Sequence, residues 1–235
     1  MQVFFDLRFD FYRIFDKSQN FTLAIFITFM SILPTNNSNI SGLIIDFDGV
    51  LCDSMPEMAN FFNHKFGISQ KSALSRIFRY SLSNKHSWFS EKIKKSQSQS
   101  YLKFLQNQPR DLVIHSMLEV LAQIPLPKAI LTTNYSILVR AILGDYSDDF
   151  IQIVGFDQVK SKTKGLEFLF ANGFEKEKSL LITDSLGDIL EFKKTVSSEQ
   201  ILASSWGFCS IPVIQTALPK NQILKNPEDL LNFLK

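Results

Sequence analysis

The second half of this 235-residue chain alternates short apolar runs with segments of helical periodicity. This alternation constrains the fold strongly, because strands joined through helices run parallel in one sheet and carry helices on both faces. We therefore predict an α/β fold with a Rossmann-like parallel sheet core flanked by helices. Strands are expected at 43–45, 128–131, 151–154, 179–183 and 201–203, and helices at 136–143, 165–171 and 186–194.

Mainly helical chain separates the first two predicted strands. The stretch "SMPEMANFFNHKFG" offers a candidate helix cap at Ser54, an early Pro56 and a closing glycine. Apolar residues continue at helical spacing in the segments that follow. We predict a small helical cap domain at 55–123, inserted into a core formed by 40–54 and 124–235.

The N-terminal 39 residues read as a poorly specified extension. Its apolar run at 21–33 is short for a transmembrane helix. The run has the length of a signal-peptide core, but the chain before it is charge-balanced and no small-residue cleavage site follows. Cys52 and Cys209 are too few for a disulfide framework and fit a reducing compartment. We expect a cytoplasmic protein, with an N-terminal signal or anchor around 21–33 as the alternative and membrane association unlikely.

The charge is unevenly distributed along the chain. Residues 55–110 contain ten Lys and Arg against Glu57 and Glu91, which is about +8, and this leaves about −6 for the rest of a chain of net charge +2. A basic segment beside an acidic one favours an anionic ligand, although a solvated helical surface would give the same pattern. The small net charge does not indicate nucleic-acid binding, so we expect no nucleic-acid partner.

Two aspartates follow the first predicted strand in "GLIIDFDGVLCDS". Burial of carboxylates is costly unless they are paired or bind a cation. Asp48-Gly49 could instead form a hairpin turn, but the chain that follows has a helical pattern and offers no partner strand. Polar residues also follow the other predicted strands, and the ends of parallel strands meet at one edge of a sheet. These residues are Thr132, Thr133, Asn134, Lys160, Lys162, Lys164, Asp184, Ser185 and Asp188.

This combination of residue types suits phosphate-ester chemistry. Carboxylate oxygens, together with water and a phosphate oxygen, meet the octahedral demands of Mg²⁺. A lysine, a hydroxyl and the metal would neutralise and hold the phosphoryl oxygens. A carboxylate can attack phosphorus, and a second carboxyl group can protonate the leaving oxygen and later activate water.

Four segments of the chain resemble the motifs of the haloacid dehalogenase-like (HAD) hydrolases, in the order that this superfamily shows. They are "DFDGVL", "ILTTN", the lysine of "KSKTKGLEF", and "LLITDSLGD". The resemblance runs from about residue 40 to the C-terminus. The segments "ASSWGF" and "ILKNPEDLLNFL" are similar to the phosphoglycolate phosphatase-like subgroup, whose members carry a small helical cap.

The resemblance implies a role for each carboxylate. Asp46 would be the catalytic nucleophile and a metal ligand. Asp48 would be the general acid and base and would offer its backbone carbonyl to the metal. The dehalogenases themselves lack an acid at this second position, so Asp48 implies phosphoryl transfer. Asp184 would coordinate Mg²⁺, with Asp188 orienting the metal site.

The resemblance also implies phosphate-binding residues. Thr132 would bind the phosphoryl group, with Thr133 as a competing assignment because the doubled threonine leaves the register open. Lys162 would stabilise the charge of the nucleophile and the phosphate. The chain departs from the family at Thr183, where glycine is usual, and at Thr163, where proline is common.

We therefore expect a Mg²⁺-dependent phosphatase that acts on a small phosphorylated metabolite through an aspartyl-phosphate intermediate. The alternatives are a phosphomutase of the β-phosphoglucomutase type, which shares the four motifs, and a non-catalytic HAD-like binding module.

Overall fold

The computed structural model describes residues 40–83, 91–107 and 111–235. The predicted extension, with its alternative signal or anchor at 21–33, lies outside these residues, as do 84–90 and 108–110 of the basic segment. None of the helices within the described ranges has both the length and the apolar character needed to cross a membrane.

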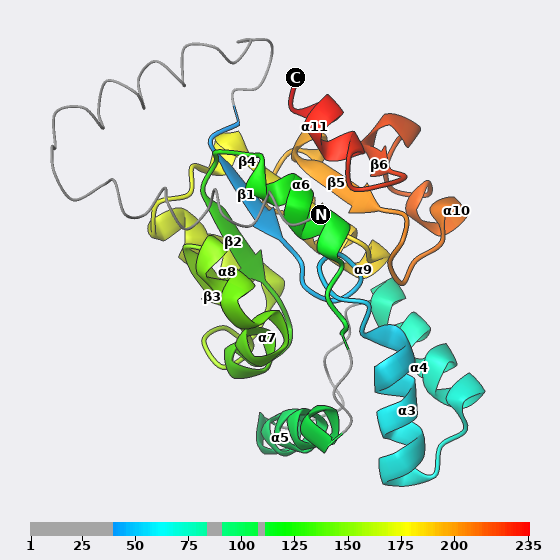
Figure 1. Cartoon of the computed structure of the whole chain (residues 1–235). Coiled ribbons are helices and arrows are strands. Elements are labelled where there is room, and N and C mark those ends of the chain that lie inside the picture. Colours follow the sequence, from blue (N-terminus) through cyan, green and yellow to red (C-terminus); the bar gives the residue numbers. More distant parts are fainter. Residues whose placement is uncertain (1–39, 84–90, 108–110) are drawn as a thin grey trace, which may run out of the picture. The chain divides into compact units, whose positions relative to one another are not determined.

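Six strands form one sheet in which every pairing is parallel (Figure 1). The strand order is β3-β2-β1-β4-β5-β6. This arrangement confirms the predicted α/β fold, and it places β1 in the interior of the sheet between β2 and β4. The strands are β1 (Gly42–Ile45), β2 (Lys128–Leu131), β3 (Gln152–Val154), β4 (Ser179–Thr183), β5 (Ile201–Ser204) and β6 (Ile223–Leu224).

Successive strand residues point to opposite faces of the sheet, and each face has its own hydrophobic cluster. Leu43 and Ile45 of β1 belong to a cluster with α6, α7 and α11, whereas Ile44 belongs to a cluster with α8, α9 and α10. Helices therefore cover both faces, and this is why β1, β4 and β5 are buried throughout and the strands read mainly as apolar runs. These helices are α6 (His115–Ala122), α7 (Ser136–Leu143), α8 (Lys162–Ala171), α9 (Leu186–Phe192), α10 (Ile211–Ile214) and α11 (Asp229–Phe233).

Short 3-10 helices complete the connections of the core. They are η1 (Gly144–Asp149), η2 (Lys176–Lys178), η3 (Ser198–Gln200) and η4 (Lys220–Gln222).

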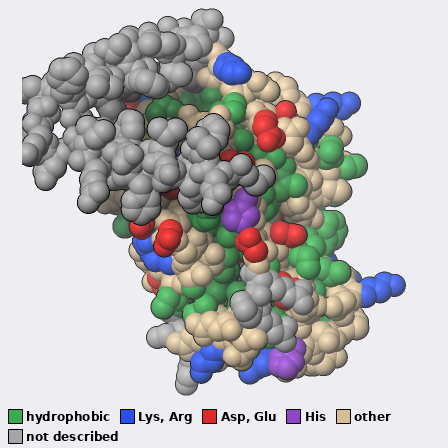
Figure 2. All heavy atoms as spheres, viewed as in Figure 1, with side chains coloured by type: hydrophobic (Ala, Val, Ile, Leu, Met, Phe, Trp, Pro, Cys, Tyr) green, Lys and Arg blue, Asp and Glu red, His purple; other side chains and the backbone are tan. Residues whose placement is uncertain are grey.

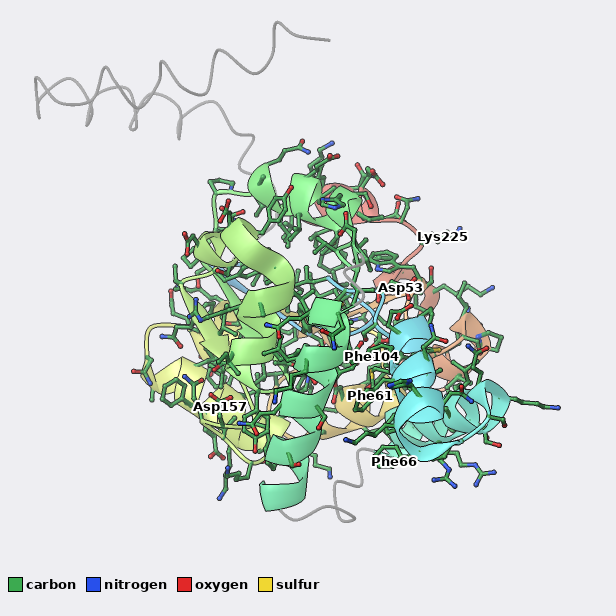
Figure 3. All side chains as sticks on the ribbon, turned by 60° about the horizontal axis from the view of Figure 1, so that its bottom comes forward. Asp53, Phe61, Phe66, Phe104, Asp157 and Lys225 are labelled. Carbon is green, nitrogen blue, oxygen red and sulfur yellow. The ribbon has the colours of Figure 1, made fainter. Side chains whose placement is uncertain are left out.

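The inserted chain forms three helices before α6: α3 (Met55–Phe66), α4 (Gln70–Ser83) and α5 (Glu91–Asn107). Phe61 of α3 packs against Tyr101 and Phe104 of α5, and Figure 3 shows Phe61 and Phe104 between these two helices. In contrast, the buried residues of α6 belong to the same cluster as the sheet. The predicted boundaries of the cap at 55–123 stay a prediction, and this packing leads us to group α6 with the core and only α3, α4 and α5 with the cap.

Several local expectations differ from the structure. Helix α8 begins at Lys162 rather than at 165, because Ser161 caps it by accepting the amide of Lys164. Helix α5 was not predicted, since its polar sequence lacks a clear apolar stripe. Strand β6 has only two residues and gave no periodic signal. Asn226 and the following proline have the sequence signature of a helix start, but helix α11 begins later, at Asp229.

Candidate active site

The predicted site residues lie at the carboxyl ends of three adjacent strands. Asp46 directly follows β1, Thr132 follows β2 and Asp184 follows β4. Because β2, β1 and β4 are neighbours in the parallel sheet, their ends meet at one edge. The chain turns sharply after β1 at Gly49, where φ is +71°, and then enters α3. The Asp48-Gly49 turn therefore does not lead into a hairpin.

Lys162 is the central cation of this edge. Its Nζ lies 2.7 Å from Asp46 Oδ1 and 3.1 Å from Asp188 Oδ2, and it donates to the carbonyl of Leu131 at 2.8 Å. Its side chain is only 2% exposed. Burial by itself lowers the pKa of Lys162, but the charges of Asp188 and Asp46 raise it above the usual value, so the ammonium stays protonated.

The structure distinguishes Lys162 from the two lysines that alternate with it. Lys160 and Lys164 are exposed, and Lys160 Nζ donates to the carbonyl of Phe156. The resemblance implied the phosphate-binding role for Lys162, and the contacts of Lys162 with Asp46 and Asp188 agree with that choice.

Asp46 is buried beside this lysine. Its Oδ1 also accepts the amide of Phe47 at 2.8 Å, which fixes the orientation of the carboxyl group. Burial raises the pKa of Asp46 well above its usual value; the charge of Lys162 lowers it, and the neighbouring Asp188 raises it again. A buried carboxylate is costly unless it is paired with a cation. Asp46 is buried, and Lys162 is its cation partner.

Asp48 is held by two side chains. Ser54 Oγ donates to its Oδ1 at 2.5 Å, and Asn134 Nδ2 donates to its Oδ2 at 2.6 Å. Burial raises the pKa of Asp48, while Ser54, the charge of Lys162 and Asn134 lower it. Ser54 was expected to cap α3, but it makes no cap bond and contacts Asp48 instead. The sequence placed Asn134 at this edge of the sheet without a role, and its bond to Asp48 gives it a positioning function.

Asp184 is enclosed by backbone. Its Oδ2 accepts the amide of Phe208 at 2.6 Å. A Cβ on Gly49 or on Gly207 would collide with its carboxyl group, so both close approaches require glycine. Burial raises the pKa of Asp184 to about 7, and the Phe208 amide opposes this shift. The sequence did not identify the contribution of the 207–208 backbone to the site.

Asp188 lies in the first turn of α9. Ser185 caps this helix, since its Oγ accepts the amide of Asp188 at 3.1 Å. Thr183 Oγ1 donates to Asp188 Oδ2 at 3.0 Å and lies 3.4 Å from Asp46 Oδ2. Thr183 was noted only as a departure from the family pattern, yet its hydroxyl is part of the site.

The two candidate phosphate-binding threonines differ in their surroundings. Thr132 is buried, and its Oγ1 accepts the amide of Asn134 at 3.1 Å, whereas Thr133 is half-buried. Because Thr132 Oγ1 only accepts a hydrogen bond in this turn, its hydroxyl hydrogen can still donate one to a ligand. Both assignments stay predictions.

Thr163, the second departure from the family pattern, links two helices. Its amide and its hydroxyl both donate to Glu191 Oε1, at 2.8 and 2.9 Å. A proline at this position could donate neither bond. The contact joins the first turn of α8, next to Lys162, to α9, next to Asp188.

The carboxylates of the site fit a hard divalent cation. Asp46, Asp48, Asp184 and Asp188 face the single ammonium group of Lys162, so negative charge exceeds positive charge among these residues. In the described part of the chain no three His, Cys, Asp and Glu side chains form a ready metal cluster. Mg²⁺ needs no such cluster, because it keeps several waters and takes one or two carboxylates. Asp46 and Asp184 are the candidate carboxylate ligands, and the Asp48 carbonyl is a candidate third.

Comparisons with known proteins identify the fold. No protein-family model matches the sequence, and no curated protein matches it either. Among solved structures, a haloacid dehalogenase-like hydrolase from Streptococcus pneumoniae aligns with TM-score 0.62 and 19% identity over 83% of this chain and 99% of its own. A phosphoglycolate phosphatase-like protein from Haemophilus somnus aligns with TM-score 0.63 and 16% identity, over 85% and 100%.

A β-phosphoglucomutase-like protein from Bacteroides vulgatus aligns with TM-score 0.58 and 20% identity, over 85% of this chain and 92% of its own. These structural neighbours are HAD-like hydrolases, phosphatase-like proteins and a phosphomutase-like protein. The chain therefore has the HAD-like fold, as the resemblance of its motifs predicted.

Proposed function

We propose that this protein is a Mg²⁺-dependent phosphatase that hydrolyses a small phosphomonoester through an aspartyl-phosphate on Asp46. The observation that carries the proposal is the contact of one buried ammonium, Lys162 Nζ, with both Asp46 and Asp188 at the edge where β1 and β4 end. A hydrogen-bonded second carboxyl group, Asp48, lies two residues after the nucleophile. The phosphatase-like neighbours in this fold support the same reaction class.

In the first half-reaction a carboxylate oxygen of Asp46 attacks phosphorus and the bond from phosphorus to the ester oxygen breaks. Lys162 offsets the negative charge of the nucleophile and of the phosphoryl oxygens. Asp48 gives its proton to the leaving oxygen, and its raised pKa favours the protonated form that this step needs. Thr132 or Thr133 would hold the phosphoryl group by donating its hydroxyl hydrogen.

In the second half-reaction Asp48, now ionised, accepts a proton from a water molecule that attacks the phosphoryl group. The bond between phosphorus and Asp46 breaks, and inorganic phosphate and the free carboxylate result. Ser54 and Asn134 hold both oxygens of Asp48, which keeps the carboxyl group in place for both steps. Bound Mg²⁺ would supply further neutralisation of the phosphoryl charge.

The inserted helices would act as a lid that excludes water from the aspartyl-phosphate. The basic side chains described on α3, α4 and α5 are all exposed, and Figure 2 shows Lys and Arg side chains on the surface of the lower part of the molecule. We propose that they attract anionic substrates over distance. They are Lys65, Lys71, Arg76, Arg79 and Lys103.

Phosphate release from a broad panel of phosphomonoesters with Mg²⁺ tests the proposal. The wild type should release phosphate, and Asp46→Asn should not, because the amide cannot form the aspartyl-phosphate. Asp53→Asn is a matched control, since Asp53 is an exposed aspartate near the same motif (Figure 3), and it should keep its activity. Release by Asp46→Asn at the wild-type rate would contradict the nucleophile assignment.

A phosphomutase is the second candidate, supported by the β-phosphoglucomutase-like neighbour. A mutase would convert one phosphosugar isomer into another and would release little free phosphate. If the wild type neither releases phosphate nor isomerises phosphosugars, a non-catalytic HAD-like binding module becomes the leading interpretation.

A further inference from the structure

One buried hydroxyl group in the inserted helices forms no hydrogen bond with the described residues around it. The side chain of Tyr101 on α5 is 8% exposed, and its hydroxyl oxygen is buried without a hydrogen-bond partner in the part of the chain that the structure describes. The ring is well fixed, since it lies 5.2 Å from the ring of Phe61 and 6.5 Å from that of Phe104. A buried hydroxyl without a partner is costly, so its retention needs a reason.

The contacts of α3 link Tyr101 to the side of the site where Asp48 lies. Ser54, directly before α3, donates to Asp48 Oδ1. One helical turn separates Glu57 from Phe61, so these two residues share a face of α3, and Phe61 contacts Tyr101. Burial raises the pKa of the Tyr101 hydroxyl, and the neighbouring Asp48, Cys52 and Glu57 raise it further. The hydroxyl therefore stays protonated and is a hydrogen-bond donor.

Glu57 is a second unusual polar group on this face. Its side chain is 2% exposed, and its Oε1 accepts Asn60 Nδ2 at 3.0 Å. Glutamate is rarely so deeply buried. A carboxylate here accepts hydrogen bonds but repels a second anion.

We propose that Tyr101 and Glu57 form a specificity site for the leaving group of the substrate, and that the substrate is a phosphorylated alcohol with at least one further neutral hydroxyl. The inference rests on the proposed phosphatase function. Asp48 protonates the leaving oxygen in that mechanism, so the remainder of the leaving group extends toward the α3 face beside Asp48. A free hydroxyl there can accept from Tyr101 and donate to Glu57.

Glu57 argues against a phosphorylated carboxylate as substrate. The carboxylate of phosphoglycolate would lie near Glu57, and two negative charges in this buried position repel each other. The preference is therefore a property of this chain's own residues and differs from what the phosphoglycolate phosphatase-like resemblance would suggest.

The test compares three phosphomonoesters of similar size: glycerol 3-phosphate, propyl phosphate and phosphoglycolate. Wild-type kcat/KM should be highest for glycerol 3-phosphate. Tyr101→Phe should lower that value about tenfold, the loss of one hydrogen bond, and should change propyl phosphate less than about twofold. Glu57→Gln should shift the preference toward phosphoglycolate. The control Tyr146→Phe alters an exposed tyrosine and should change none of these values.

Binding measured by calorimetry in the Asp46→Asn background separates this inference from the proposed function. There, Tyr101→Phe should raise Kd for glycerol 3-phosphate about tenfold and leave propyl phosphate unchanged. Such binding without wild-type turnover would support the specificity site and contradict the phosphatase. A wild-type preference for phosphoglycolate, in turnover or in binding, would overturn the specificity site. So would a Tyr101→Phe variant that lowers turnover or binding equally for all three compounds, or for none of them.

Thermal unfolding distinguishes a ligand-binding role of the hydroxyl from a structural one. Tyr101→Phe removes a buried group that has no partner, so its Tm should equal or exceed that of the wild type. A marked loss of Tm would indicate that the hydroxyl serves the fold and would count against the inference.

Discussion

Thr183 Oγ1 donates a hydrogen bond to Asp188 Oδ2 at 3.0 Å, and the same hydroxyl lies 3.4 Å from Asp46 Oδ2. Thr183 is fully buried at the end of β4. Lys162 contacts the same oxygen of Asp188 at 3.1 Å. A residue that departs from the family pattern thus joins the lysine, the aspartate of α9 and the proposed nucleophile into one network.

Replacement of Thr183 should show that its hydroxyl positions Asp188. Thr183→Val keeps the shape but removes the donor, so kcat should fall about tenfold and the free energy of unfolding should fall by about 1–3 kcal/mol. Thr183→Ser keeps the hydroxyl and should retain most of the activity. Equal kcat values for the two variants, measured with the preferred substrate, would contradict this role.

Lys162 should be essential in a way that its neighbouring lysine is not. Lys162→Met leaves Asp46 and Asp188 without their shared cation, so phosphate release should fall at least about a hundredfold. The free energy of unfolding should fall by about 3–5 kcal/mol in urea titrations. Lys160→Met, two residues earlier and exposed, should stay within about twofold of wild-type activity. A comparable loss in both variants would argue against the assigned role of Lys162.

The metal-free protein should become less stable as pH rises from about 4 to 7. The pKa of Asp184 is raised from 3.8 to about 7 in the folded state. In this window the folded protein holds a proton that the unfolded chain has released, so rising pH favours unfolding. Tm measured in a chelator should fall over this range, and Asp184→Asn should flatten the fall.

Added Mg²⁺ should stabilise the protein more at pH 8 than at pH 5.5. The metal binds the ionised carboxylates, whereas protons compete for them at the lower pH. Binding to the folded state alone raises Tm by mass action. A Tm gain that is equal at the two pH values, or that Asp184→Asn leaves intact, would contradict the assignment of Asp184 as a ligand.

The contact between Thr163 and Glu191 should support the site without taking part in chemistry. Glu191→Ala removes the acceptor of two hydrogen bonds, so the free energy of unfolding should fall by about 1.5–3 kcal/mol. Glu167→Ala, an exposed glutamate of α8, should have little effect on stability. Urea unfolding of both variants checks this, and a similar small change in both would show that the helix link is unimportant.

Single substitutions can decide between the two candidate threonines. The residue that donates to the phosphoryl group should lose about tenfold or more in kcat/KM when changed to valine. Thr132→Val also removes the acceptor for the Asn134 amide, so it alone should lower Tm. A loss of activity in Thr133→Val with wild-type activity in Thr132→Val would assign the role to Thr133.

Local sequence signals determined the main elements of the core. The predictions for β2, β4 and α7 match the structure residue for residue, because apolar runs bounded by polar residues and glycines leave little choice of boundary. The aspartates, threonines and lysines that follow these strands also predicted the edge of the sheet where the candidate site residues lie. Composition, however, could not reveal α5, since its sequence is mostly polar.

Only the tertiary structure decided what each side chain contacts. Ser54 has the signature of a helix cap, but the fold brings it within 2.5 Å of Asp48. Thr183 gains its role from Asp188 and Lys162, and Lys162 reaches Asp46 across 116 positions of sequence. Secondary structure follows from short-range backbone preferences and from hydrophobic periodicity, and both can be read from the sequence alone. Hydrogen bonds and ion pairs between distant segments depend on how the strands order themselves in the sheet, and that ordering arises only when the whole core packs.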